Sequence, residues 1–137
     1  MNFYIASKLK NASRVRQLAE MLTSFGWEHT YDWTSHGCVL GSEGALREVA
    51  DKELRGVAQA DLFIVLLPGG RGTHTELGSA LMSGCSIVLH SEQPEVFDAM
   101  SEETRSFYWL PAVQRVCCPY PDLVWWLERR YGAVTKI

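Results

Sequence analysis

Short apolar runs alternate with longer amphipathic stretches along this chain. The apolar runs predict five strands, at residues 3–6, 27–33, 62–67, 86–90 and 114–118. Between them, apolar residues recur every three or four positions, which is typical of helices that bury one face. This spacing predicts helices at residues 13–25, 43–58, 77–82 and 122–131, the last capped by Asp122. Residues 34–42 predict a loop, and residues 91–111 predict a loop with a short helix in part.

The alternation of strands and helices indicates one α/β domain over residues 1–137. The third strand is continuously apolar, as expected for a parallel strand that is buried on both faces. We therefore expect a parallel sheet with helices on both faces, in which ligands bind beyond the carboxyl ends of the strands. No repeat or linker divides the chain.

The segment after the third strand is the most informative. It contains, in order, Pro68, Gly69, Gly70, Arg71, Gly72, Thr73 and, in the first turn of the next helix, Glu76. Glycines let the backbone approach a ligand, and free N–H groups at a helix start attract anions such as phosphate. The helix dipole is expected to keep the Glu76 carboxylate ionised, which suits attack on a sugar carbon. A tight turn with Glu76 as a first-turn charge would give the same pattern.

Two other segments are expected at the same edge of the sheet. Ser7 and Lys8 follow the first strand. They are candidates to bind a 5′-phosphate or a 5′-hydroxyl, and the alternative is an ordinary polar junction between strand and loop. Asp32 and Trp33 lie at the end of the second strand. Asp32 is a candidate to bind a ribose hydroxyl or a base edge, and Trp33 either stacks on the base or packs in the core.

Two aromatic clusters lie outside these segments. Residues 107–109 (FYW) either close a pocket or pack in the core, and the two tryptophans at 125–126 are expected in the core or at an interface. Neither pattern alone distinguishes a ligand contact from packing.

Composition narrows the choice of partners. The 137 residues carry a net charge of −3, with 47% hydrophobic and 21% charged residues, which points to neither a polymeric nucleic acid nor an anionic membrane. No apolar run approaches the roughly 18 residues of a membrane helix, and the first strand starts without a secretory signal.

The cysteines indicate a reducing compartment. Cys38, Cys85, Cys117 and Cys118 form no C-x-x-C pair, so we expect four reduced thiols in a cytoplasmic protein. His36 and Cys38 have ligand spacing, but no second pair accompanies them, so we expect no zinc or other metal site.

Four stretches carry a resemblance to a known family: FYIAS at 3–7, TYDWT at 30–34, ELRGVAQAD at 53–61 and GTHTELGSAL at 72–81. Through them the chain resembles the nucleoside 2-deoxyribosyltransferase-like superfamily over nearly its whole length. The resemblance implies a five-stranded parallel sheet of flavodoxin-like (Rossmann-like) order 2-1-3-4-5 in a three-layer sandwich. It also implies cleavage of the N-glycosidic bond of a (deoxy)nucleoside or nucleotide without a cofactor. The enzyme it implies is a homodimer or higher homo-oligomer with active sites at the subunit interface.

The resemblance assigns catalytic roles as well. Glu76 matches the glutamate that forms a glycosyl ester, and Tyr4 matches a tyrosine that hydrogen-bonds this nucleophile, although a strand-one aromatic is also typical of a core. Glu53 stands where the family usually has an aspartate that serves the departing base. As a solvated helix residue, Glu53 would instead pair with Lys52 or Arg47.

Several functional hypotheses stay open at this stage. Gly70 stands where deoxyribosyltransferases carry an aspartate, which weakens the case for base exchange and leaves hydrolysis open. The string PGGRGTHTE also resembles the motif of cytokinin-activating phosphoribohydrolases, which cleave the same type of bond. A nucleotide-binding or sensing module without turnover and an NAD-type dinucleotide glycohydrolase are the alternatives.

Overall fold

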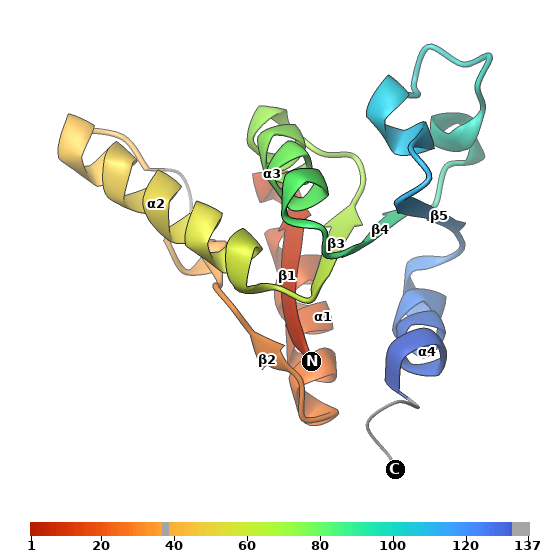
Figure 1. The fold of residues 1–137 in the computed structure, drawn as a ribbon, viewed down its shortest axis with the longest axis horizontal. Coiled ribbons are helices and arrows are strands. Elements are labelled where there is room, and N and C mark those ends of the chain that lie inside the picture. The colour runs from red at the N-terminus through yellow and green to blue at the C-terminus, as the bar shows by residue number, and fades with distance from the viewer. Residues whose placement is uncertain (37–38, 133–137) are drawn as a thin grey trace.

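The computed structural model describes residues 1–36 and 39–132. Within these two ranges, five strands and four α-helices follow one another (Figure 1). The strands are β1 (Asn2–Ser7), β2 (Glu28–His29), β3 (Leu62–Leu66), β4 (Ser86–Ser91) and β5 (Val113–Cys117). The helices are α1 (Ala12–Ser24), α2 (Glu43–Gln59), α3 (Arg71–Ser83) and α4 (Tyr120–Tyr131).

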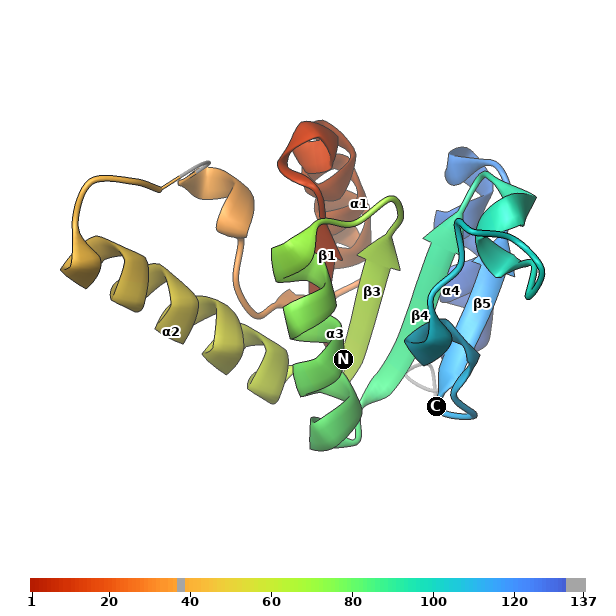
Figure 2. The same cartoon turned by 90° about the horizontal axis from the view of Figure 1, so that it is seen from above.

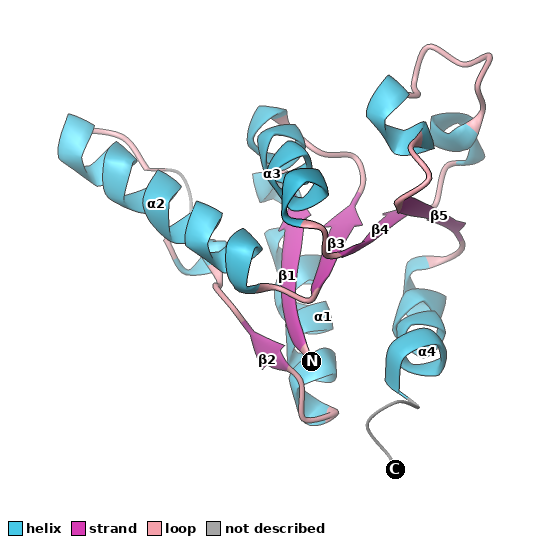
Figure 3. Cartoon of the chain, viewed as in Figure 1, coloured by secondary structure: helices cyan, strands magenta, loops and turns pink. Residues whose placement is uncertain are grey.

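The strands form one sheet in the order β2-β1-β3-β4-β5, and every neighbouring pair is parallel. Helices α2 and α3 pack together, and α1 contacts α4. Figure 1 shows α3 in front of the sheet and α1 behind it, and Figure 3 shows the same layers by type of element. The expected flavodoxin-like sandwich with order 2-1-3-4-5 is therefore confirmed.

The carboxyl ends of the strands meet at one edge of the sheet. The arrowheads of β3 and β4 point to the same side in Figure 2, where the loop between β3 and α3 begins. Every residue of β3 is buried, which agrees with its continuously apolar sequence. In β1, residues 3–6 are completely buried.

The second strand and the last helix have other boundaries in the structure than the sequence predicts. The alternating residues 27–33 predict a long strand, but β2 contains only Glu28–His29. The side chain of Asp32 accepts a hydrogen bond from the Thr34 N–H and turns the chain into a 3-10 helix, Trp33–Ser35. Pro119 occupies the N-cap of α4, which starts at Tyr120, so the prediction of Asp122 as the cap is wrong.

The third helix begins six residues before the predicted range. Gly70 is the N-cap of α3, and its N–H donates to the Thr73 hydroxyl at 3.0 Å. Apolar periodicity could not mark this start, because the first residues of the helix are polar or glycine. Glu76 is consequently in the second turn of α3, and the first turn contains no acidic residue.

Candidate active site

Glu76 and Tyr4 meet above the sheet. The face of α3 that packs on the strands contains Thr73, Glu76, Leu77 and Ala80, all buried. Glu76 is 8% exposed, and Oε2 of its carboxyl accepts a hydrogen bond from the hydroxyl of Tyr4 on β1. The Tyr4 ring itself is fully buried and stacks on Phe63. The tyrosine therefore holds one carboxyl oxygen of Glu76 in a fixed position.

Helix α2 brings a second carboxyl to the same place. A Cβ atom at Gly56 would lie 2.8 Å from Cβ of Tyr31 and 3.0 Å from the Tyr4 ring, so only glycine permits this close packing of α2. Glu53, one turn earlier on α2, interacts with the Glu76 carboxyl by charge and by hydrogen bonding.

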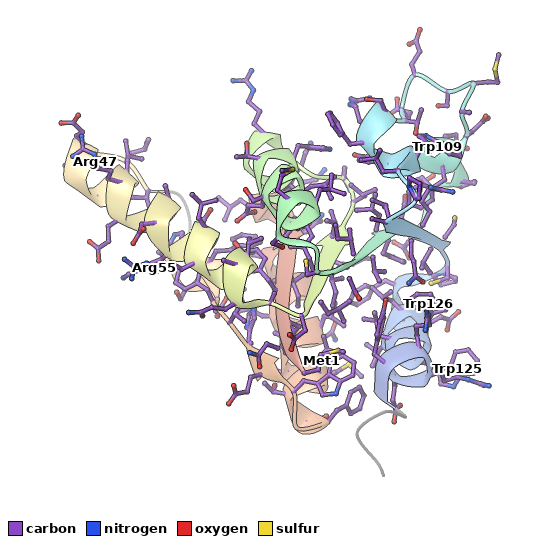
Figure 4. All side chains as sticks on the ribbon, viewed as in Figure 1. Met1, Arg47, Arg55, Trp109, Trp125 and Trp126 are labelled. Carbon is purple, nitrogen blue, oxygen red and sulfur yellow. The ribbon has the colours of Figure 1, made fainter. Side chains whose placement is uncertain are left out.

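Glu53 does not take the pairing expected of a solvated helix residue. The neighbouring cations Lys52 and Arg47 form ion pairs with Glu48 and Glu43, one turn away on the same helix. Arg47 lies at the outer end of α2, away from the sheet (Figure 4). The Glu53 carboxyl instead faces the imidazole of His36, with Oε1 at 3.7 Å from Nε2.

Burial, rather than the helix dipole, controls the protonation of Glu76. Removal from water raises the pKa of Glu76 from its ordinary 4.5 to about 8, and the nearby Glu53 carboxylate acts in the same direction. The Tyr4 hydrogen bond acts against this rise. Burial and the Glu76 charge raise the pKa of Tyr4 as well, so its hydroxyl stays protonated. The prediction of a first-turn, dipole-stabilised carboxylate is wrong in its position and in its electrostatics.

The turn after β2 borders the carboxyl pair. Tyr31 contributes its ring, stacked on His36 at 5.9 Å between centroids. Asp32 uses one carboxyl oxygen within the turn, bonding the N–H and the hydroxyl of Thr34. Trp33 is 8% exposed and its indole N–H donates to the Ile5 carbonyl at 2.7 Å, an arrangement that corresponds to the packing alternative for this residue. Cys38, considered above as a metal ligand with His36, lies outside the described residues.

Residues 67–70, between β3 and α3, form the glycine loop, which is fixed by the side chain of Thr73 in the first turn of α3. Thr73 is buried, and its methyl group would be 2.6 Å from a Cβ at Gly69. Its hydroxyl accepts from Gly70, as described above, so both groups of Thr73 shape the loop. Gly72 is exposed, with open space around it, and nothing in the packing requires glycine there.

Ser7 and Lys8 have different surroundings. The Ser7 hydroxyl donates to the Leu66 carbonyl at 2.6 Å and accepts from Nδ2 of Asn11 at 2.9 Å, so it joins β1 to β3. The Lys8 stem passes beside Gly70 and faces a cavity of about 170 Å³ that Pro68 and Gly69 also line. Of the two, Lys8 is the residue that carries a charged group at this edge.

His74 and Tyr108 form a contact that the sequence did not reveal. Nδ1 of His74 donates to the Gly70 carbonyl at 2.6 Å, and Nε2 of the same ring hydrogen-bonds the Tyr108 hydroxyl at 2.7 Å. Tyr108 lies in the 3-10 helix Ser106–Trp109, is 3% exposed and packs against Phe97. The segment 91–111 is thereby attached to the glycine loop.

The remaining candidate groups are distant from Glu76 in the fold. Trp125 on α4 is 58% exposed with Arg129 over its ring, and Trp126 beside it is half-buried (Figure 4). Cys85, Cys117 and Cys118 are unpaired thiols. Within residues 1–36 and 39–132, no three His, Cys, Asp or Glu side chains are grouped so as to hold a metal ion, and no helix is long and apolar enough to cross a membrane.

Solved structures share this fold. A CMP N-glycosidase, BcmB, from Clostridium botulinum has a TM-score of 0.66 and 19% identity, and the match covers 93% of this chain and 99% of that one. A 2-deoxyribosyltransferase from Bacillus psychrosaccharolyticus has a TM-score of 0.63 and 18% identity, with 90% of each chain covered. A conserved protein from Enterococcus faecalis has a TM-score of 0.60 and 17% identity, covering 95% and 98% of the two chains.

These similarities show the fold: the expected nucleoside 2-deoxyribosyltransferase-like architecture is confirmed. No protein-family model and no curated protein sequence matches the chain. The chemistry of the site therefore has to be argued from its own residues.

Proposed function

We propose that this protein cleaves the N-glycosidic bond of a nucleoside or nucleotide, with Glu76 as the nucleophile. The observation that carries the proposal is the grouping of the buried Tyr4 and Glu76 with the half-buried Glu53, which three different elements bring together. A structural carboxyl in this position would be expected to pair with a cation. Glu76 instead bonds a tyrosine hydroxyl and lies against a second carboxyl.

In the first step, Oε1 of Glu76 attacks C1′ while the bond from C1′ to the base nitrogen breaks. The bonding electrons leave with the base, which therefore needs a proton. Because Glu76 has a raised pKa, it must first give up its own proton, and Glu53 is the adjacent acceptor. We assign to Glu53 the transfer of that proton to the departing base.

In the second step, water attacks C1′ and releases the sugar from Glu76. Glu53, now ionised, takes a proton from this water, and the Glu76 carboxylate is restored. A second base in place of water would give transfer. We favour hydrolysis because Gly70 offers no carboxyl beside the Lys8 side chain, which lies 3.8 Å from where a Cβ would stand.

The direct test measures base release by chromatography from the four common nucleosides, their deoxy forms and their 5′-monophosphates. Glu76→Gln should lower the rate by at least about 10³-fold. Glu20→Gln, which changes an exposed glutamate on α1, is the matched control and should be unchanged. A 2-fluoro nucleoside should leave its sugar mass on the peptide that contains Glu76. Base release by Glu76→Gln at the wild-type rate would refute the proposal.

The second candidate function is nucleotide binding without turnover, and the raised pKa of Glu76 favours it, because a protonated carboxyl is not a nucleophile. Calorimetric binding of a nucleotide that is never cleaved would identify this function. The homodimer that the resemblance implies and the cytoplasmic location that the cysteines indicate remain part of the proposal. Light scattering of the purified protein tests its oligomeric state.

A further inference from the structure

A cavity at the carboxyl ends of β3 and β4 lies on the far side of the glycine loop from Glu76. Glu76 and His74 are two residues apart on α3, which places them roughly 200° apart around the helix axis. Glu76 accordingly faces Tyr4, whereas His74 faces Tyr108 in the segment 91–111. Beneath that segment is a cavity of about 470 Å³, a size typical of small-molecule sites.

A smaller cavity connects the glycine loop to the larger one. Its volume is about 170 Å³, and it shares the side chains of Leu67, Pro68, Val96 and Glu103 with its larger neighbour. Lys8 and Gly69 line the small cavity as well. A ligand that starts at Glu76 and passes over the glycine loop would cross the small cavity before it entered the large one.

The small cavity has the chemistry of a phosphate site. Lys8 and Arg105 both line it, and in the described part of the chain neither cation lies within 4.0 Å of a carboxylate. Among the residues that the structure describes, Arg105 donates to the main-chain carbonyls of Glu102 and Thr104. One carboxyl, that of Glu103, also lines the cavity, so the charge of the lining is positive overall. Two cations without carboxylate partners favour an anion between them.

The large cavity has the opposite charge. It is lined by Glu92, Glu95 and Glu103, and its one cation, Arg14, is already paired with Glu92 at 2.8 Å. A further phosphate would be repelled there. Carboxylates and the neighbouring amides of Asn11 and Gln93 are instead suited to sugar hydroxyls, as a carboxylate is in binding the ribose of a dinucleotide.

From this order of charges we propose that the protein binds nucleoside diphosphate conjugates, a nucleoside joined through a diphosphate to a neutral, hydroxyl-bearing group. Lys8 and Arg105 hold the diphosphate, and the conjugated group fills the cavity under the segment 91–111. His74 and Tyr108 are positioning residues, since they attach that segment to the glycine loop. The inference rests on the proposed function only in placing the nucleoside at Glu76.

The test is isothermal titration calorimetry on Glu76→Gln, with two ligand series because the base is not specified. The adenine series is adenosine, AMP, ADP, ATP and ADP-ribose, and the uracil series is uridine, UMP, UDP, UTP and UDP-glucose. In at least one series the conjugate should bind about tenfold more tightly than the monophosphate, and the triphosphate more weakly than the diphosphate.

Two variants test the two cavities independently. Arg105→Ala should weaken every phosphate-bearing ligand about tenfold and leave the free nucleoside unchanged. Glu95→Lys, at an exposed position, should weaken the conjugate and strengthen the triphosphate. Equal binding of monophosphate and conjugate, an unchanged response in Arg105→Ala, or no binding in either series would overturn the inference. Absence of base release by the wild-type protein, with the calorimetric order preserved, would refute only the proposed cleavage.

Discussion

Replacement of Glu76 by glutamine should stabilise the fold while it abolishes catalysis, and the stabilisation should grow with pH. The burial that raises the Glu76 pKa from 4.5 to about 8 favours the protonated side chain in the native state. As the pH rises through this window, the unfolded chain releases the proton more readily than the folded one. The wild-type protein therefore loses stability between about pH 4.5 and pH 8, and glutamine, which does not titrate, removes this loss.

The size of this stability difference follows from the shift in the pKa of Glu76. At about 1.36 kcal/mol for each pKa unit, the full shift corresponds to about 5 kcal/mol, of which about 3 kcal/mol is lost by pH 7. Local rearrangement around the charged pair relieves part of this, so we expect a difference of about 2 kcal/mol at pH 7. For a domain of this length, that difference raises Tm by roughly 6–8 °C.

Urea unfolding followed by tryptophan fluorescence at pH 5, 7 and 9 measures the effect. The free energy of unfolding of Glu76→Gln should exceed that of the wild type by an amount that increases over the three pH values. Glu20→Gln, at an exposed position on α1, should differ from the wild type by no more than about 0.5 kcal/mol at each pH. Parallel pH profiles for the wild type and Glu76→Gln would show that the carboxyl is not buried in its protonated form.

Two further predictions follow from the same contacts. Tyr4→Phe removes the hydrogen bond that lowers the pKa of Glu76, so Glu76 gives up its proton to Glu53 less readily and the rate at pH 7 should fall about 10-fold to 100-fold. The fall of kcat/KM at high pH, where the carboxyl pair loses the proton that the base needs, should move to higher pH. Gly56→Ala would place its Cβ 2.8 Å from Tyr31 and should destabilise the fold by about 1–3 kcal/mol in urea unfolding. Gly44→Ala, on the same helix with open space around it, is the control and should stabilise by up to about 1 kcal/mol. Equal effects of the two alanines would contradict the packing argument.

The sequence pattern predicted the parallel sheet because its strands have simple patterns, whereas the order of the strands came from the resemblance. Residues 62–66 are apolar without interruption, and the helical stretches on either side have clear periodicity. The end of the second strand was predicted wrongly because aromatic alternation at 27–33 resembles a strand, whereas Asp32 turns the chain through a hydrogen bond to the Thr34 N–H. That hydrogen bond depends on the local backbone conformation, which cannot be predicted from the pattern of hydrophobic residues.

The residues around the candidate site are brought together by contacts between positions that are far apart in the sequence. Tyr108 lies 34 positions after His74, and its burial against Phe97 could not be distinguished from exposure in an irregular aromatic segment. Tyr4, Glu53 and Glu76 could be grouped in advance only through the resemblance. Their spacing along the chain carries no signal of the Gly56 contact that allows α2 to approach Tyr4.

The corrected position of Glu76 changes how its ionisation has to be explained. A helix dipole contributes about 0.3–1 kcal/mol and falls off beyond the first turn, whereas the burial of Glu76 in the second turn corresponds to about 5 kcal/mol in the opposite direction. The dipole cannot keep this carboxyl ionised, so ionisation has to be coupled to the reaction. A proton that passes from Glu76 to Glu53 and then to the base leaves the nucleophile charged only when a leaving group is there to receive it. In this scheme the close approach of two carboxyls, which would otherwise only destabilise the fold, serves as the route of the proton.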